Sequence, residues 1–215
     1  MTQTNPKGSL SSAITIVGIA GGTASGKSTF TKALVSALHD IESSTQVDVL
    51  GTDRYFRSGT PEMPTLVSPS MGVTLPDYNH PDALDLPRFL VDLEAQVRAP
   101  DAPDVLLIEG LMVLYMPEIL EWLDLRLFVE LDADTRALRR LVRNIGRRHD
   151  PIPDHSPQSI ANYYLESAKA GHARYIEPSR IHADLIVRGD ADFARVTPMI
   201  AAVICERRLE RRVRL

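Results

Sequence analysis

Five short, mostly apolar runs divide the chain, and each is shorter than an ordinary helix. They cover residues 14–20, 47–50, 104–108, 125–130 and 184–187. Valine, isoleucine and leucine dominate these runs, which are nearly continuous rather than alternating with polar residues. Such runs are typical of parallel strands buried on both faces. The chain therefore predicts a sheet of five parallel strands.

Segments with helical spacing of apolar residues separate these runs. Residues 28–39 carry apolar side chains at positions 30, 34, 35 and 38, and Asp85 is a typical N-cap for a helix over residues 86–98. Further helices are predicted over residues 132–147, from the loop after residue 157 up to Pro178, and over residues 192–209. Strands that alternate with helices predict an α/β fold whose parallel sheet is sandwiched by helices. We expect a single domain over residues 1–215.

Two proline-rich segments interrupt this alternation. Six prolines lie between residues 57 and 87, at positions 61, 64, 69, 76, 81 and 87. Proline this dense predicts a long loop without helix or sheet, and we expect residues 57–80 to form a flap over a substrate. Prolines 151, 153 and 157 mark a second loop. It suits a hinged lid over residues 140–157.

Composition narrows the class of protein. The net charge of −4 gives no reason to expect a nucleic acid or an anionic membrane as partner. The single cysteine excludes an intramolecular disulfide, as suits a reducing compartment. The first 13 residues lack the apolar core of a signal peptide, and no apolar run is long enough to span a bilayer. We therefore expect a cytoplasmic protein, and the sequence leaves its oligomeric state open, a homo-oligomer included.

The most specific motif follows the first predicted strand. Residues Gly21, Gly22, Thr23, Ala24, Ser25, Gly26, Lys27, Ser28 and Thr29 contain the pattern GxxxxGK[ST]. Its glycines let the backbone wrap a polyphosphate with N–H groups pointing inward, and the helix that follows offers its N-terminus to the same anion. Lys27 is expected to reach the β- and γ-phosphates and the Ser28 hydroxyl to bind Mg²⁺. The motif predicts a P-loop that binds ATP.

Two acidic residues favour a kinase among the P-loop proteins. Asp53 follows the second predicted strand and Glu109 ends the third. In a parallel sheet both would stand beside the phosphates, where one can act as a base for an acceptor hydroxyl and either can bind a metal ion. The guanine-reading pattern NKxD of GTPases is absent. Taken singly, each acid could equally well have no catalytic role.

A row of arginines follows on the helix predicted over residues 132–147. Arg136, Arg140, Arg143 and Arg147 are spaced by four, three and four residues, which places them on one helical face. Arginine grips phosphate oxygens with a planar fork and keeps its charge. A solvated amphipathic helix would show the same pattern. Because a P-loop precedes it, we predict that Arg140 and Arg143 neutralise charge on the transferred phosphate.

The chain resembles the uridine kinase / phosphoribulokinase family. The segments that carry the likeness follow the family order and are GGTASGKST (21–29), TDRYFR (52–57), YNHPDALD (78–85), IEGLMVLY (108–115), LFVELDADTRALRRLVRN (127–144) and IEPSRIHADLIVRG (176–189). The resemblance implies that Asp53 is the catalytic base. It also implies that Ser28 and Glu109, with Asp53 beside them, bind magnesium. Arg140 and Arg143 match lid arginines that contact phosphates.

Several departures from the family concern the substrate. Phe56 stands where uridine kinases usually carry a tyrosine, Asn162 near a family glutamine, and Asn79 replaces an aspartate that holds ribose hydroxyls. The lid triplet RGR is here Gly146, Arg147 and Arg148. The hairpin that reads the pyrimidine in uridine kinases is missing, because only residues 99–103 separate the second helix from the third strand. The flap, with Tyr55, Tyr78 and His80 near it, is the candidate replacement, although Tyr55 and Tyr78 could equally well be packing residues.

The sequence thus predicts a kinase that uses ATP and Mg²⁺ to phosphorylate a hydroxyl group of a small metabolite. Lys27, Asp53, Arg140 and Arg143 are the predicted catalytic residues. A nucleoside 5′-hydroxyl is the first choice of acceptor, and a sugar, a sugar phosphate or another hydroxylated metabolite is the alternative. A non-catalytic nucleotide-binding switch is the alternative from another class.

Overall fold

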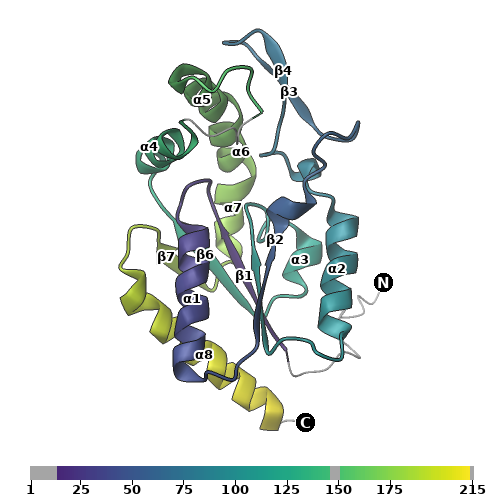
Figure 1. Cartoon of the computed structure of the whole chain (residues 1–215), viewed down its shortest axis with the longest axis vertical. Coiled ribbons are helices and arrows are strands. Elements are labelled where there is room, and N and C mark those ends of the chain that lie inside the picture. The colour runs from purple at the N-terminus through teal and green to yellow at the C-terminus, as the bar shows by residue number, and fades with distance from the viewer. Residues whose placement is uncertain (1–13, 146–150, 214–215) are drawn as a thin grey trace.

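The computed structural model describes residues 14–145 and 151–213, and its centre is a parallel sheet with helices on both faces (Figure 1). The sheet has five strands in the order β2-β5-β1-β6-β7, and every pairing in it is parallel. The strands are β1 (Thr15–Gly21), β2 (Val47–Gly51), β5 (Val105–Glu109), β6 (Leu125–Glu130) and β7 (Leu185–Arg188). The predicted five-stranded parallel sheet is confirmed.

Two layers of helices cover the sheet. Helices α1 (Lys27–Ile41) and α8 (Phe193–Val213) lie on one face, and α2 (Leu86–Arg98) lies on the other (Figure 1). Strand β1 explains the arrangement, since Val17 belongs to the cluster built around Phe30 of α1 and Ile16 to the cluster built around Phe89 of α2. Both faces of β1 are therefore buried, and the apolar run that predicted it needs no polar alternation.

The parallel sheet brings three distant segments to one edge. Ile19 of β1 pairs with Glu109 of β5, and Gly51 of β2 pairs with the same Glu109. The turn after β1, the short 3₁₀ helix Thr52–Tyr55 after β2 and the end of β5 are consequently neighbours. This edge, formed by the carboxyl ends of the strands, is where ligands bind in such folds.

The proline-rich segment over residues 57–87 contains a hairpin, so its prediction as a loop without regular structure is wrong. Strands β3 (Thr65–Ser68) and β4 (Val73–Pro76) pair antiparallel, and the turn between them uses Gly72 at φ 66°. The prolines at 64, 69 and 76 flank the strands or end them, where no ladder hydrogen bond is lost. Short stretches of valine, threonine and leucine between prolines were the missed signal.

Helix α3 (Pro117–Leu120) lies between β5 and β6, and α4 (Ala133–Asn144) follows β6. Residues 151–156, before the next helix, have no regular secondary structure. A helical run then passes through α5 (Pro157–Tyr163), α6 (Lys169–Gly171) and α7 (Glu177–Ser179), with π-helical turns at Tyr164–Ala168 and His172–Ile176. The prediction that Pro178 ends this helix is wrong, because the run continues through a 3₁₀ turn to His182. Pro178 follows a widened π turn, which tolerates a residue without an N–H group.

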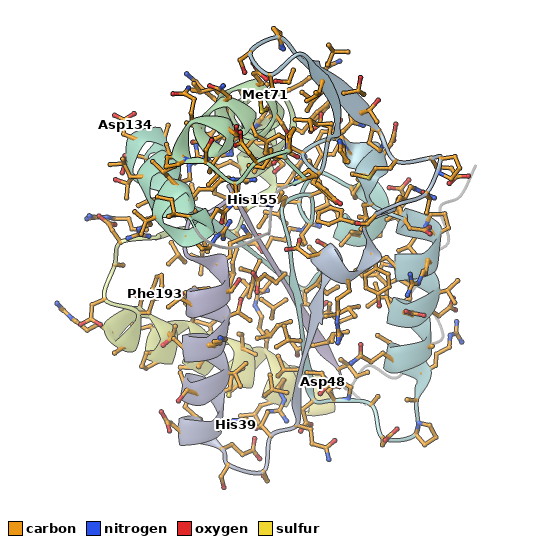
Figure 2. The ribbon with its side chains drawn as sticks, turned by 45° about the horizontal axis from the view of Figure 1, so that its top comes forward. His39, Asp48, Met71, Asp134, His155 and Phe193 are labelled. Atoms are coloured by element: carbon orange, nitrogen blue, oxygen red, sulfur yellow. The ribbon has the colours of Figure 1, made fainter. Side chains whose placement is uncertain are left out.

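The hairpin packs on this helical run. Leu75 of β4 shares a buried cluster with Ile160 and Tyr163, and Met71 at the hairpin turn packs against it (Figure 2). The Tyr163 hydroxyl donates to the Pro76 carbonyl at 2.8 Å. The expected flap and the helix that follows the expected lid are thus in contact. Residues 146–150 of the lid, which include Gly146, Arg147 and Arg148, lie outside the described residues.

Across residues 14–145 and 151–213, no helix combines the length and the apolar character needed to cross a membrane.

Candidate active site

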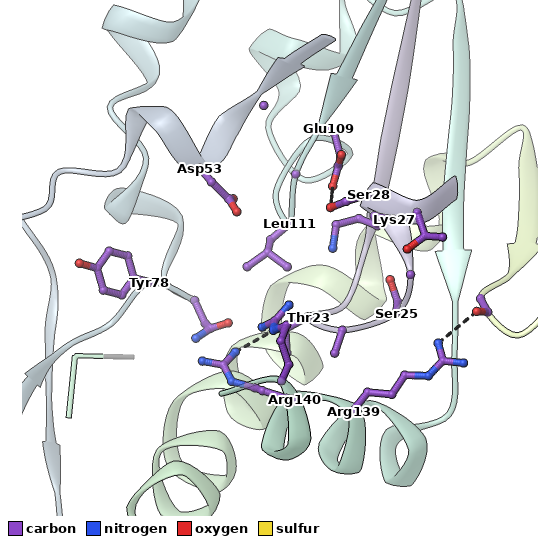
Figure 3. Close-up of a pocket in the computed structure, with 18 of the residues that line it drawn as sticks. Thr23, Ser25, Lys27, Ser28, Asp53, Tyr78, Glu109, Leu111, Arg139 and Arg140 are labelled. Atoms are coloured by element: carbon purple, nitrogen blue, oxygen red, sulfur yellow. Dashed lines mark hydrogen bonds between the residues drawn. The ribbon is translucent and has the colours of Figure 1, made fainter. Parts of the chain in front are cut away.

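The turn after β1 has the backbone that a phosphate-binding loop needs (Figure 3). Gly26 caps α1 with φ 103°, and Gly21 has φ 144° with its Cα so close to β6 that a Cβ would lie 2.3 Å from the Val129 carbonyl oxygen. Neither position accepts a larger residue without strain. Helix α1 begins at Lys27 and has no acidic residue in its first turn. Its N-terminal N–H groups are therefore available to an anion.

Lys27 is buried beneath this turn. Its Nζ donates to the carbonyl oxygens of Gly21 and Gly22, at 2.9 Å each. Burial lowers the pKa of Lys27 to about 8; Asp53 and Glu109 oppose this shift, whereas Arg143 and Arg136 add to it. Within the described part of the chain, these two carbonyl oxygens are the hydrogen-bond partners of the ammonium group. A polyphosphate in the cavity would stabilise its charged form.

Ser28 and Glu109 meet at the sheet edge. The Ser28 hydroxyl donates to Glu109 Oε1 at 2.6 Å, which joins the first turn of α1 to the end of β5. Hydroxyl and carboxylate oxygens are the ligands that Mg²⁺ prefers, and Mg²⁺ usually takes one or two of them from the protein and the rest from water and phosphate. Among the described residues no group of three or more His, Cys, Asp or Glu side chains gathers as a metal site. The pair therefore fits Mg²⁺ held jointly with a nucleotide.

Asp53 lines the same cavity from the 3₁₀ helix after β2 (Figure 3). Desolvation by the surrounding protein raises the pKa of Asp53 above its usual value. The charge of Glu109 adds to this rise, whereas Lys27 and Arg143 oppose it. The side chain nevertheless stays exposed toward the open cavity. A carboxylate with a raised pKa at an accessible position is suited to accept a proton from a hydroxyl group.

Arg140 and Arg143 of α4 face the cavity. Arg140 is buried, donates to the Thr23 hydroxyl at 2.9 Å and lies over the ring of Tyr163 at 5.6 Å. Arg143 donates to Asn144 Oδ1 at 3.0 Å, and both residues line the cavity. The apolar stripe of the same helix points outward, with Leu138 and Val142 exposed. The polar face of α4 is thus the one that meets the P-loop.

Phe56, Tyr78 and Asn79 line the same cavity as Asp53. Phe56 and Tyr78 contact each other edge to face, with ring centroids 5.2 Å apart. Asn79 is buried, and its Nδ2 donates to Ser167 Oγ at 2.8 Å, while the Ser167 hydroxyl donates to Asp77 Oδ1 at 2.7 Å. These hydrogen bonds fix the orientation of the Asn79 amide, because its Nδ2 donates to Ser167. The carbonyl oxygen Oδ1 is left to accept a hydrogen bond.

Three expected substrate residues lie away from the cavity lining. The Tyr55 ring packs edge to face on Phe89 and its hydroxyl donates to Asp92, so the Tyr55 side chain is tied to α2. His80 caps the turn at Pro81–Ala83 through Asp82 N–H. Asn162 accepts a hydrogen bond from Gln158 at the surface of α5. None of the three is in the lining of the cavity, whose volume is about 1260 Å³.

The sequence analysis missed several residues that line the cavity. They are Gly51, Arg54, Gly110, Leu111, Arg139, Asn144, the loop Gly189–Ala191 after β7, and Phe193. Arg139 donates to the Gly189 carbonyl oxygen at 3.2 Å, which ties α4 to that loop. Loops after parallel strands gather at one edge, so the predicted fifth strand was itself a signal for residues 189–191.

Known proteins resemble this chain in sequence and in fold. A sequence model of the "Phosphoribulokinase / Uridine kinase family" matches residues 67–192. A uridine kinase of Clostridium botulinum strain Okra is 29% identical over 210 residues, which cover 87% of this chain and 95% of that protein. A uridine kinase of Deinococcus deserti is 30% identical over 80% of this chain and 86% of its own length.

A solved structure shares the fold. The crystal structure of a proposed fructose transport system kinase from Silicibacter sp. TM1040 superposes with a TM-score of 0.62 at 18% identity, and the match covers 86% of this chain and 92% of that one. At this identity the likeness concerns the fold. With the family match over residues 67–192 and a relative 30% identical across most of both chains, the chain belongs to the phosphoribulokinase / uridine kinase family and is a kinase of that family.

Proposed function

We propose that this kinase transfers the γ-phosphate of ATP, with Mg²⁺, to a hydroxyl group of a small metabolite, and that a nucleoside 5′-hydroxyl is the first candidate. One observation carries the proposal: a single cavity is lined by the P-loop, by the Ser28–Glu109 pair and by Asp53. Phosphoryl transfer depends mainly on positioning and charge neutralisation, and these groups supply both.

Each group has a distinct task in the proposed reaction. Lys27 and the N-terminus of α1 bind the phosphates, and Arg140 and Arg143 neutralise charge that develops on the transferred group. Asp53 accepts the proton of the acceptor hydroxyl. Ser28 and Glu109 would hold Mg²⁺, which neutralises phosphate charge when it is bound. The helix α4 and the lid beyond it would close over the nucleotide, and residues 57–80 over the acceptor.

The acceptor side favours a hydroxylated molecule. The amide of Asn79 is oriented by Ser167, so its carbonyl oxygen can accept a hydrogen bond from a substrate hydroxyl. The neighbouring pair of Phe56 and Tyr78 offers an apolar wall with a polar tip, since the Tyr78 hydroxyl donates to Ser58 at 3.1 Å. A nucleoside combines hydroxyl groups with a flat base and matches both features. The relatives named uridine kinase support this choice.

A sugar or sugar phosphate is the second candidate, and a specific observation favours it. Helix α2 ends at Arg98 and β5 begins at Val105, so no hairpin stands between them to read a base. The neighbour in fold is described as a proposed fructose transport system kinase. An acceptor without a base would need only the hydroxyl-binding side of the cavity.

The test is a screen of ATP consumption with nucleosides, sugars and sugar phosphates as acceptors, followed by mass measurement of the product. The proposal expects at least one acceptor that raises ATP consumption well above the acceptor-free rate and gains one phosphate. Slow hydrolysis without any acceptor, combined with binding to another protein that depends on the nucleotide, would instead indicate a nucleotide-binding switch.

A further inference from the structure

Arg136, near the start of α4, is a buried cation that forms no ion pair with a carboxylate within residues 14–145 and 151–213. The residue is 4% exposed, and its Nε donates to the Leu131 carbonyl oxygen at 3.0 Å. Within the described part of the chain, its Nη1 has no hydrogen-bond partner. Asp132 accepts from Thr135 N–H, and Glu177 contacts His172 and Arg180, so each of these carboxylates has another partner. Burying a guanidinium in this way costs stability unless a counter-charge arrives.

The side chain lies directly behind the phosphate-binding loop. A Cβ added to Gly22 would lie 2.6 Å from Arg136 Nη1 and 2.9 Å from His172 Nδ1. Neither Arg136 nor Gly22 is in the lining of the cavity, whose P-loop part begins at Thr23, so Arg136 contacts the loop away from that lining. Its charge nevertheless reaches the site, because Arg136 is one of the groups that lower the pKa of Lys27.

His172 completes the arrangement from the helical run. Its Nε2 lies 3.2 Å from Glu177 Oε2, and its Nδ1 is buried without a partner in the described residues. With Glu177 as the acceptor for Nε2–H, the neutral ring turns the lone pair of Nδ1 toward the space that it shares with Arg136. The imidazole is therefore a neutral neighbour that fills this space and adds no second positive charge.

We propose that Arg136 is a positioning residue whose counter-ion is the polyphosphate of the bound nucleotide, acting through the P-loop at Gly22, with His172 as its neutral support. This inference rests on the proposed function, because it needs a polyphosphate in the cavity. The charge of Arg136 would then contribute to nucleotide affinity although Arg136 does not touch the nucleotide. Such an interaction grows with the negative charge of the ligand, whereas a purely structural role would affect all ligands equally.

The experiment measures binding to the full chain by calorimetry with adenosine, ADP and a non-hydrolysable ATP analogue. Arg136→Met removes the charge, Arg136→Lys keeps it, and Arg136→Gln provides a neutral variant with a hydrogen-bond donor for Leu131. Arg98→Met removes an exposed guanidinium from α2 as a matched control. We expect Arg136→Met and Arg136→Gln to weaken binding of the ATP analogue by on the order of tenfold. Binding of ADP should weaken by less, and binding of adenosine should change little. Arg136→Lys should recover most of the loss.

Two results would overturn the inference. The first is wild-type affinity for the ATP analogue in a folded neutral variant, and the second is an equal loss for adenosine, ADP and the ATP analogue. If the wild-type chain itself binds neither ADP nor the ATP analogue, the proposed function fails and the inference fails with it. The wild-type measurement therefore separates the two failures, and melting temperatures without ligand show which variants are folded.

Discussion

Ser28 Oγ and Glu109 Oε1 lie 2.6 Å apart, although 81 positions separate the two residues in the sequence. The hydrogen bond connects the first turn of α1 with the last residue of β5, both at the edge of the sheet where Asp53 also lies. It holds a hydroxyl and a carboxylate oxygen side by side. Such preorganisation is what a shared site for metal and phosphate requires.

Replacing Glu109 should change the magnesium requirement. Glu109→Gln keeps the shape of the side chain and a hydrogen bond to Ser28 but removes the charge that attracts the cation. We expect the Mg²⁺ concentration for half-maximal activity to rise by about 10- to 100-fold, as for other losses around metal sites. The measurement is the rate as a function of free Mg²⁺ at saturating ATP. Glu118→Gln, an exposed change on α3, is the control, and an unchanged Mg²⁺ dependence in Glu109→Gln would remove Glu109 from the metal site.

Removing the ammonium of Lys27 should abolish most phosphoryl transfer. Lys27→Met has similar length and can occupy the same buried space, but it cannot balance charge on the transferred phosphate. We expect kcat to fall by about 10²-fold or more at saturating acceptor, with circular dichroism unchanged. Lys32→Met on the same helix, a change at an exposed position, serves as the control. Near wild-type turnover in Lys27→Met would show that the P-loop assignment is wrong.

Asp53→Asn should separate the chemical step from folding. The amide cannot accept the hydroxyl proton, so kcat should fall by about 10²- to 10⁴-fold. The raised pKa means that the folded state holds the Asp53 proton more tightly than the unfolded chain does; the ionised form therefore weakens folding as pH rises through this pKa. At neutral pH the neutral Asn should leave the melting temperature equal or higher. If kcat changes little with every accepted substrate, Asp53 is not the catalytic base.

Much of this fold could be predicted because its signals are local. The apolar runs are strands, and Asp85 caps α2 through Arg88 N–H as expected. Strands β1, β5 and β6 are buried, whereas the edge strands β2 and β7 are largely exposed, so the expectation that all five are buried on both faces is wrong. The hairpin β3–β4 escaped prediction because its stability comes from packing on Tyr163 and Ile160, far along the chain. Pro178 was misread for a related reason. Its missing N–H group is tolerated by a π turn, and a π turn has no reliable signal in a single sequence.

The site, like the fold, contains residues that the sequence predicts and residues that only the structure reveals. The P-loop and the two acids follow from motif and topology, and the pair of Ser28 and Glu109 needed only the parallel register. Tyr55 and His80 lie beside cavity residues in the sequence, but their side chains turn toward α2 and Tyr175. Adjacent residues in a 3₁₀ turn point in different directions, so proximity in sequence could not decide which of them face a ligand. Only the folded chain shows that Arg136 is buried behind Gly22.

Acid should destabilise the chain through His172. Burial lowers the pKa of His172 to about 4, with Arg136 adding to the shift, Glu177 opposing it and Lys27 contributing least. Because the unfolded chain takes up this proton more readily, the stabilisation is present above the usual pKa of histidine and is lost as pH falls toward 4. His172→Gln should flatten the fall in the free energy of unfolding between pH 6.5 and 4, whereas His39→Gln at the exposed end of α1 should not. Urea unfolding at several pH values measures this, and parallel curves for wild type and His172→Gln would contradict it.

The acceptor preference should reflect the segment that is missing between α2 and β5. A site that selects a pyrimidine does so with buried groups that bond its edge, and such a site rejects poor matches by about 10⁴-fold. Residues 99–104 supply no strand and no aromatic side chain there, and the hairpin β3–β4 packs Leu66, Val73 and Leu75 on the helical run. We therefore expect no strong preference for uridine and cytidine. The measurement compares kcat/KM for uridine, cytidine, adenosine, ribose and ribulose 5-phosphate. A preference for the pyrimidine nucleosides of about a thousandfold or more would mean that residues 57–80 read the base, because groups that bond a pyrimidine edge must then come from that cover.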